Sequence, residues 1–143
     1  MKNFRFLEHT ADLKFLAIGN TIEECFENSA MAMFSAIVNI DYVKDDVKKN
    51  IRISSRELEI LLHDFLSELL FIFETENLIF RKFNVKIKIN NENKEYVLNA
   101  IAYGERFDNE RHEIKTHIKA VTFHDFFIRK ENDRWKAQVL CDI

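Results

Sequence analysis

A continuous apolar stripe between residues 58 and 73 constrains the fold of this chain more than any other feature. Its members recur at steps of three and four residues, as along one face of an α-helix: Leu58, Leu61, Leu62, Phe65, Leu66, Leu69, Leu70 and Phe73. The stripe is wide, so we expect this helix to be covered by sheet on much of its circumference. Ser54-Ser55-Arg56-Glu57 offers a capping box at its start.

A second amphipathic helix is predicted to begin at Thr21 and to end near Asn39. Thr21-Ile22-Glu23-Glu24 is a capping box, in which the Thr21 hydroxyl accepts from the Glu24 N–H and Glu24 reaches back. Behind it, apolar residues again recur at helical steps: Ile22, Cys25, Phe26, Met33, Phe34 and Ile37. The chain is therefore expected to contain two helices, each with one apolar face.

Segments in which apolar and polar residues alternate predict the strands. They cover residues 13–18, 51–53, 83–90, 96–103, 114–124, 126–130 and 135–142. The order is strand, helix, strand, helix and then an antiparallel meander, which is typical of the α+β class. We expect one domain over residues 1–143, with the two helices packed against mostly antiparallel sheets.

Composition excludes several classes of protein. The formal net charge of −3 argues against a general phosphate-backbone binder, which is usually basic. Gly19 and Gly104 are isolated, so the chain has neither a GxGxxG fingerprint nor a P-loop. The start of the chain lacks the apolar region of a signal peptide, and no apolar run approaches the roughly 20 residues that span a bilayer. Because Cys25 and Cys141 stand far apart, we expect reduced thiols and a cytoplasmic protein, or a nuclear one in a eukaryote.

Asp142 is the most informative candidate for a functional residue. It closes a strand whose alternate residues are expected to face the core, namely Trp135, Ala137, Val139 and Cys141. Asp142 should therefore face the other way, with the α-carboxylate of Ile143 beside it. Two such anionic groups need a bound cation, a solvated rim or a protonated carboxyl. Asp12, just before a predicted strand, is either a strand-start cap or part of a similar site.

The other polar residues have structural interpretations. Residues 105–113 have the composition of a charged loop. His117 and Lys119 alternate with Ile118 on a predicted strand, which favours its solvated face. His63 lies beside the apolar stripe of the later helix, so we expect it at the boundary between core and surface.

An ordered series of motifs nevertheless resembles the archease family over essentially the whole chain. The motifs are His9-Thr10-Ala11-Asp12; Gly19 with Thr21, Glu23, Glu24 and Phe26; the Ser55-to-Glu76 helix; Gly104-Glu105-x-x-Asp108-x-x-x-Arg111-His112; Lys119-Ala120-Val121-Thr122-Phe123-His124; and Asp142-Ile143. Phe123 departs from the family, which usually has tyrosine there, so any role of that hydroxyl is in doubt. Leu13 stands where other aliphatic residues are common.

The resemblance implies a layered α+β fold, one calcium site and a protein partner. The calcium ligands would be Asp12, Asp142 and Ile143, with magnesium or manganese as alternative ions. Carboxylates without a Cys/His cluster favour such hard cations over zinc. The partner would be the RNA-splicing ligase that joins 3′-phosphate or 2′,3′-cyclic phosphate ends to 5′-hydroxyl ends. Lys119, His9 and His124 would face that partner.

The resemblance also implies what kind of protein this is. An archease is not itself an enzyme: it promotes the guanylylation of the ligase and its multiple turnover in tRNA splicing. We expect no membrane association and no direct sequence-specific binding of nucleic acid.

Two alternatives belong to other functional classes. One is a stand-alone metal-dependent phosphohydrolase, in which Asp12 and Asp142 hold the metal and His9, His112 or His124 supplies acid–base chemistry. The other is a purely structural interaction module whose acidic rim binds no metal.

Overall fold

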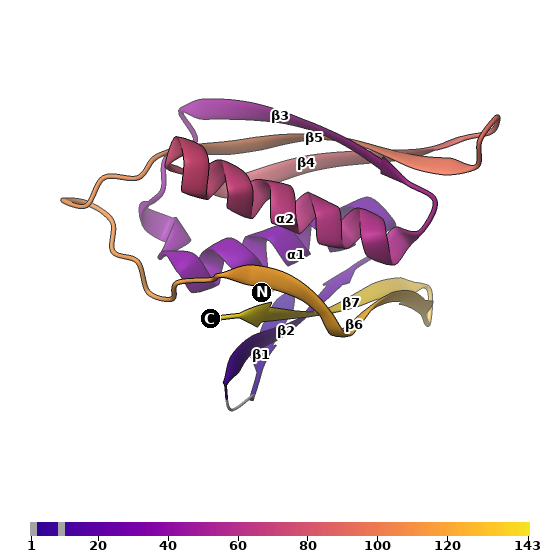
Figure 1. Cartoon of the computed structure of the whole chain (residues 1–143), viewed down its shortest axis with the longest axis horizontal. Helices are drawn as coiled ribbons and strands as arrows, with labels where there is room; N and C mark the ends of the chain where they lie inside the picture. The colour runs from indigo at the N-terminus through magenta and orange to yellow at the C-terminus, as the bar shows by residue number, and fades with distance from the viewer. Residues whose placement is uncertain (1–2, 9–10) are drawn as a thin grey trace.

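The computed structural model describes residues 3–8 and 11–143, and it has two antiparallel sheets with two helices between them (Figure 1). The elements are β1 (Phe4–Leu7), β2 (Asp12–Gly19), α1 (Ile22–Ile37), the 3₁₀ turn η1 (Ile40–Tyr42), β3 (Val47–Ser55), α2 (Leu58–Glu76), β4 (Leu78–Asn90), β5 (Glu95–Arg106), β6 (Ala120–Glu131) and β7 (Arg134–Asp142). One sheet has the order β1-β2-β7-β6 and the other β3-β5-β4. The predicted α+β class is confirmed.

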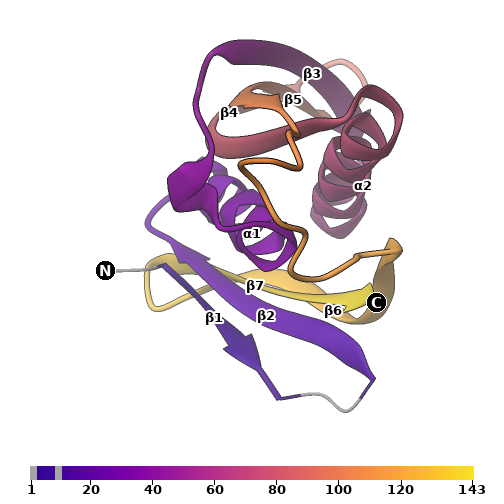
Figure 2. The same cartoon turned by 90° about the vertical axis from the view of Figure 1, so that its left-hand side faces the viewer.

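The helices form the middle of three layers, which Figure 2 shows end-on. α1 packs between β4 and β2, and α2 packs between β3 and β6. Phenylalanines join the layers: Phe26 of α1 lies 6.1 Å from Phe65 of α2, and Phe34 meets the ring of Phe80 edge-on at 5.5 Å. All four side chains are fully buried, so the wide stripe of α2 is covered as expected.

Only the first predicted capping box is confirmed. Thr21 Oγ1 accepts from the Glu24 N–H at 3.1 Å, and a Glu24 carboxylate oxygen accepts from the Asn20 N–H at 3.2 Å. The second box is wrong, because Ser55 is still paired in β3 and α2 begins at Leu58. Ser55 Oγ instead accepts from the Glu57 N–H in a local turn.

The prediction of a strand over residues 114–124 is wrong for its first half. Residues 107–119 form an irregular loop, and β6 begins at Ala120. Hydrogen bonds to other elements replace strand pairing in this loop: the Lys115 N–H donates to the Ile37 carbonyl at 2.7 Å and the Lys119 N–H to the Asp142 carbonyl at 2.8 Å. The alternation of polar and apolar residues there reflects this packing and not a sheet.

β6 is one distorted strand where two were predicted. Its register with β7 shifts between Thr122 and Phe127, and Asp125 adopts a positive φ of 52°. Within this distortion, the ring of Phe123 stacks on His63 of α2 at 3.9 Å. β1 was not predicted, because four residues are too few for alternation to be recognised.

Both glycines allow close approach of two backbones. A Cβ on Gly104 of β5 would lie 1.8 Å from the Ile79 carbonyl oxygen, beside the irregularity of β4 between Phe80 and Lys82. A Cβ on Gly19 would lie 2.3 Å from the Cys25 nitrogen. A side chain is excluded at either position unless the backbone moves.

Both cysteines, Cys25 and Cys141, are buried free thiols, as expected. Burial raises the pKa of each thiol to about 12, so neither is a reactive thiolate.

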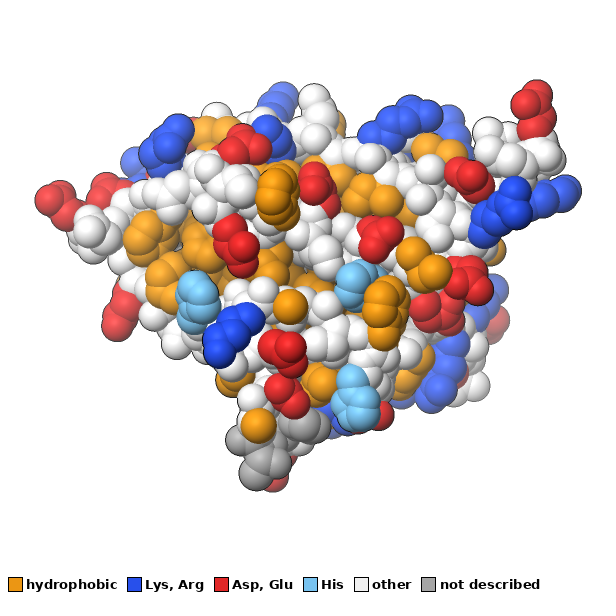
Figure 3. Space-filling model, in the orientation of Figure 1, with side chains coloured by type: hydrophobic (Ala, Val, Ile, Leu, Met, Phe, Trp, Pro, Cys, Tyr) orange, Lys and Arg blue, Asp and Glu red, His pale blue; other side chains and the backbone are white. Residues whose placement is uncertain are grey.

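Among the described helices, none has the length and apolar character to cross a membrane. Basic side chains gather along the upper rim of the space-filling view, over the β3-β5-β4 sheet (Figure 3).

Candidate functional site

Asp12 and Asp142 meet at one end of the β1-β2-β7-β6 sheet. β2 begins at Asp12 and β7 ends at Asp142, and because the strands are antiparallel the two residues are direct partners in the register. The next pair along, Leu13 and Cys141, packs with the core. Successive side chains alternate across a sheet, so both aspartates belong to the face that points away from the helices. Asp142 is exposed and Asp12 is half-buried.

The environment of these carboxylates fits a hard cation. Like charges directly opposite each other on paired strands are destabilising. Lys14 belongs to the same face two residues along β2, but its Nζ lies 3.6 Å from the Asp125 carboxylate and so is already paired. Oxygen ligands are those that calcium and magnesium take. Over residues 3–8 and 11–143, no three His, Cys, Asp or Glu side chains lie where they could hold a metal ion together, so the described side chains would supply only part of a coordination shell.

Lys119 and Ile143 lie at the same end of the sheet. Ala120 of β6 pairs with Asp142 from the side opposite to Asp12, and the Lys119 N–H donates to the Asp142 carbonyl at 2.8 Å. The Lys119 side chain is exposed, and Ile143 follows Asp142 with 44% of its surface exposed. Four of the residues singled out in the sequence are thus gathered in one place, and their roles as ligands or contacts stay predictions.

His124, a further candidate residue, is not part of this group. His124 follows Ala120 by four residues and lies in the distorted part of β6, between Thr122 and Phe127. It is exposed, and its Nε2 lies 3.8 Å from the Asp125 carboxylate. His9 lies outside the described residues.

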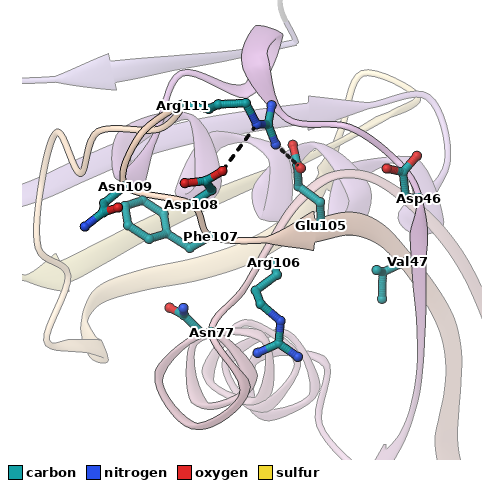
Figure 4. A pocket seen from close by; sticks show the side chains of 9 residues that line it. All are labelled: Asp46, Val47, Asn77, Glu105, Arg106, Phe107, Asp108, Asn109 and Arg111. Atoms are coloured by element: carbon teal, nitrogen blue, oxygen red, sulfur yellow. Dashed lines mark hydrogen bonds and ion pairs between the residues drawn. The ribbon is translucent and has the colours of Figure 1, made fainter.

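A buried ionic network, which the sequence did not predict, forms where residues 105–113 were interpreted as a charged loop. Glu105 at the end of β5 is only 7% exposed. One of its carboxylate oxygens accepts from the Lys44 N–H at 2.7 Å and from His112 Nε2 at 3.1 Å. The other pairs with the Arg111 guanidinium, as Figure 4 shows. Arg111 also reaches Asp108 at 3.7 Å.

The hydrogen bonds of His112 fix its tautomer. Its Nδ1 accepts from the Asp108 N–H at 3.0 Å, so this nitrogen carries no proton. Nε2 must then hold the ring proton, which it shares between Glu105 and the Tyr42 carbonyl, both at 3.1 Å. His112 therefore joins the start of the loop, η1 and β5 as a fixed structural link.

The network also sets the charge state of Glu105. Burial acts to raise its pKa, but the hydrogen bonds from Lys44 and His112 act in the opposite direction. With the charge of Arg111 added, the pKa of Glu105 lies below its ordinary value. The carboxylate therefore stays ionised in the fold.

A signal for this network was present in the sequence, since Glu105 and Arg111 carry opposite charges on either side of a turn and His112 follows. Sequence alone does not show that Lys44 lies beside them.

The hollow next to the network, about 660 Å³ in volume, opens between β3, β5 and the loop (Figure 4). Arg111 spans part of it to reach its carboxylate partners.

Comparisons with known proteins agree with this fold. The archease protein family matches residues 4–143. A protein archease of Methanosarcina acetivorans is 46% identical over 142 residues, which are 99% of this chain and 97% of that protein. One of Pyrococcus furiosus is 42% identical over 144 residues and covers 100% of each chain.

Solved structures agree as well. The solution structure of protein 1598 of Methanobacterium thermoautotrophicum superimposes with a TM-score of 0.85 at 38% identity, over 100% of both chains. The crystal structure of an archease of Thermotoga maritima, described as a possible chaperone, has a TM-score of 0.60 at 22% identity, over 96% of this chain and 94% of that one. The latter supports the fold alone. The sequence relatives extend over the whole chain, and the chain belongs to the archease family.

Proposed function

We propose that this protein is a calcium-binding accessory protein that activates an RNA-splicing ligase by promoting its guanylylation and multiple turnover. The observation that carries the proposal is the pairing of Asp12 with Asp142, with Ile143 and Lys119 at the same end of the sheet. This end of the molecule combines a half-buried carboxylate, an exposed carboxylate and an exposed lysine. It is a suitable surface for metal-dependent contact with another protein.

The ligand set supports an open metal site. Calcium takes six to eight oxygen ligands. Asp12, Asp142 and a main-chain or terminal oxygen of Ile143 supply only part of that number. When bound, the cation would neutralise the two carboxylates and offer its remaining positions to anionic groups of the ligase. Magnesium or manganese could occupy the same oxygens, and calcium is preferred because its coordination is more flexible.

Lys119 is proposed to contact the ligase directly. Its main chain is held in place by the Asp142 carbonyl, while its side chain stays exposed. An ammonium group next to a partly coordinated cation would bind a phosphate or carboxylate of the partner. Neither this contact nor the metal requires the protein to recognise an RNA sequence.

A ligation time course tests the proposal. With the ligase limiting and RNA in excess, the protein should raise the multiple-turnover rate, and Lys119→Ala should lose that activation. Because Lys119 is exposed, its removal should change the free energy of unfolding by no more than about 0.5 kcal/mol. The matched control is Lys130→Ala, an exposed lysine at the opposite end of β6. Equal rates with and without the protein, under conditions where the ligase is slow, would count against the proposal.

A stand-alone phosphohydrolase would need a general acid or base beside the aspartates. Of the described candidates, His112 is committed to Glu105 and Tyr42, and His124 lies farther along β6. Neither of these two histidines therefore supports a phosphohydrolase, and we keep the accessory role as our proposal. Hydrolysis of phosphomonoesters or cyclic phosphates by the purified protein with divalent metals would favour the enzyme instead.

A further inference from the structure

The outer face of the β3-β5-β4 sheet carries a concentration of positive charge that the net charge of −3 conceals. The register aligns outward-facing residues in four rows across the sheet: Lys48, Tyr103 and Lys82; Asn50, Ile101 and Asn84; Arg52, Asn99 and Lys86; and Ser54, Val97 and Lys88. None of these twelve residues is acidic, and the next row of the same face pairs Asn90 with Glu95. The helices cover the opposite face of the sheet, so the rows point to solvent (Figures 1 and 2).

The rows divide the face into three tracks along the strands. The central track on β5 has an aromatic ring, apolar side chains and an amide: Tyr103, Ile101, Asn99 and Val97. The cations stand on the flanking strands, with Lys48 and Arg52 on β3 and Lys82, Lys86 and Lys88 on β4. Neighbouring strands are about 4.8 Å apart, so the cationic tracks are separated by roughly 10 Å across β5.

Local contacts show how the tracks are held. The ammonium groups of Lys48 and Lys82, which belong to the two flanking strands, lie 5.8 Å and 5.1 Å from the centroid of the Tyr103 ring. Farther along β5, the Arg52 guanidinium reaches the Asn99 side-chain oxygen at 3.5 Å. A hollow of about 370 Å³ lies over the second and third rows, lined by Asn50, Ile51, Arg52, Asn84, Lys86, Asn99, Ala100 and Ile101.

We propose that this face binds single-stranded RNA along β5 without sequence preference. Phosphates would contact the flanking cations, while bases would lie on Tyr103 and the apolar side chains and hydrogen-bond to the asparagines. The cations alone would also match an acidic protein surface, but aromatic and amide side chains between two cationic tracks are the arrangement that a single strand of nucleic acid contacts with its bases and its phosphates. The choice of RNA over DNA rests on the proposed function, whereas the binding itself does not.

The proposal concerns a surface different from the aspartate pair. Asp12 and Asp142 belong to the other sheet, across the helical layer (Figure 2). One molecule could therefore hold RNA on one sheet and contact the ligase through the other.

Fluorescence anisotropy with a labelled oligouridylate of about 12 nucleotides tests the proposal on this protein alone. Saturable binding is expected at about 50 mM salt, and its affinity should fall linearly with salt on a logarithmic scale. Two double variants, Arg52→Gln with Lys86→Gln and Lys48→Gln with Lys82→Gln, should each reduce the salt slope by about 1.4, since each phosphate contact contributes about 0.7 for a single strand. Each should also weaken binding about tenfold at low salt. A DNA oligonucleotide of equivalent sequence should bind more weakly.

The matched control is Lys130→Gln with Arg134→Gln, which removes the same charge from exposed positions on the other sheet. It should keep binding within about twofold. The proposal is overturned if the protein shows no saturable RNA binding at about 50 mM salt, if the control weakens binding as much as the face variants, or if a labelled oligoglutamate binds as tightly as RNA. Because no ligase is present, none of these outcomes depends on ligase activation.

Discussion

Asp12 and Asp142 carry like charges at directly opposed positions of an antiparallel pair, an arrangement in which each carboxylate disfavours the other. The sequence indicated each of them as a possible ligand, and the register supplies the reason to consider them together. Metal binding would convert a local repulsion into an attraction. Whether a substitution at this pair raises or lowers the stability of the fold should therefore depend on the presence of calcium.

Replacing Asp142 with asparagine tests this dependence. With one anionic ligand lost, calcium affinity measured by calorimetric titration should fall at least about tenfold, because ligand charge is a main determinant of calcium affinity. Without calcium, Asp142→Asn should be as stable as the native protein or slightly more stable. With calcium in excess, the native protein should gain more stability through binding than the variant. Asp133→Asn in the β6–β7 turn is the control and should behave like the native protein; equal calcium affinity of Asp142→Asn would exclude Asp142 as a ligand.

Glu105 makes stability depend on pH. Its pKa is lower in the fold than its ordinary value of 4.5, so its ionised form stabilises the fold above that value. This contribution is lost as the pH falls through the folded-state pKa. Glu105→Gln should lower the free energy of unfolding by about 1–3 kcal/mol at neutral pH, because Arg111 and His112 lose a charged partner.

Urea denaturation at a series of pH values measures this effect. The difference between the native protein and Glu105→Gln should shrink below pH 4.5, where the native carboxyl also becomes protonated. Glu110→Gln is the control, since Glu110 is exposed on the same loop, and it should stay within about 0.5 kcal/mol. A difference that stays constant with pH would show that the ionised state of Glu105 is unimportant.

At the scale of elements, hydrophobic periodicity predicted those helices and strands that are determined by packing against the core. Both helices and most strands follow from patterns in which the apolar residues of one face pack on the core, as in α2, where only Leu58 and Phe73 of the stripe are half-buried. The predictions were wrong for segments whose hydrogen bonds are made to other parts of the chain. Ser55 looks like a helix cap but belongs to β3, and residues 114–119 alternate like a strand but bond to α1 and β7. These partners are distant in sequence, so no local pattern could identify them.

Among positions within the helices and strands, Gly104 is the one that we expect to tolerate substitution least. Gly104→Ala would bring a Cβ to 1.8 Å from the Ile79 carbonyl oxygen, and backbone cannot rotate away as a side chain can. We expect a loss of about 3 kcal/mol or more in the free energy of unfolding, at the upper end for overpacking. Asn99→Ala on the exposed side of the same strand should cost far less. Thermal unfolding of the two variants makes the comparison, and equal melting temperatures would contradict the required close approach of β4 and β5.

At the scale of the whole molecule, the loop of residues 107–119 connects the two sheets across the helical layer. Its ends are fixed by the Glu105 network and by the Lys119 hydrogen bond to Asp142. The aspartate pair and the Glu105 network could not be assembled from the sequence by periodicity, because each joins distant segments. Resemblance to the archease family indicated the aspartate pair, whereas the Glu105 network became visible only in the structure.

Hydrogen exchange should show that this loop is ordered although it lacks regular secondary structure. The amides of Lys115 and Lys119 donate to carbonyl groups of α1 and β7, so they should exchange much more slowly than the amide of Glu113, for which the described part of the chain offers no acceptor. In Glu105→Gln, exchange at Lys115 should accelerate. Rapid exchange at all three amides of the native protein would contradict a fixed loop.

The pairing of β2 with β7 has a consequence for biosynthesis. β2 leaves the ribosome before β7, its neighbour in the sheet, which is the last of the described elements along the chain. Asp12 therefore cannot meet Asp142 on a nascent polypeptide that stops short of residue 142. Domains fold as units once their parts have emerged, and pairing between distant strands comes late. A prematurely terminated translation product could thus accumulate helices but would lack the aspartate pair, so it could not compete for whatever that pair binds.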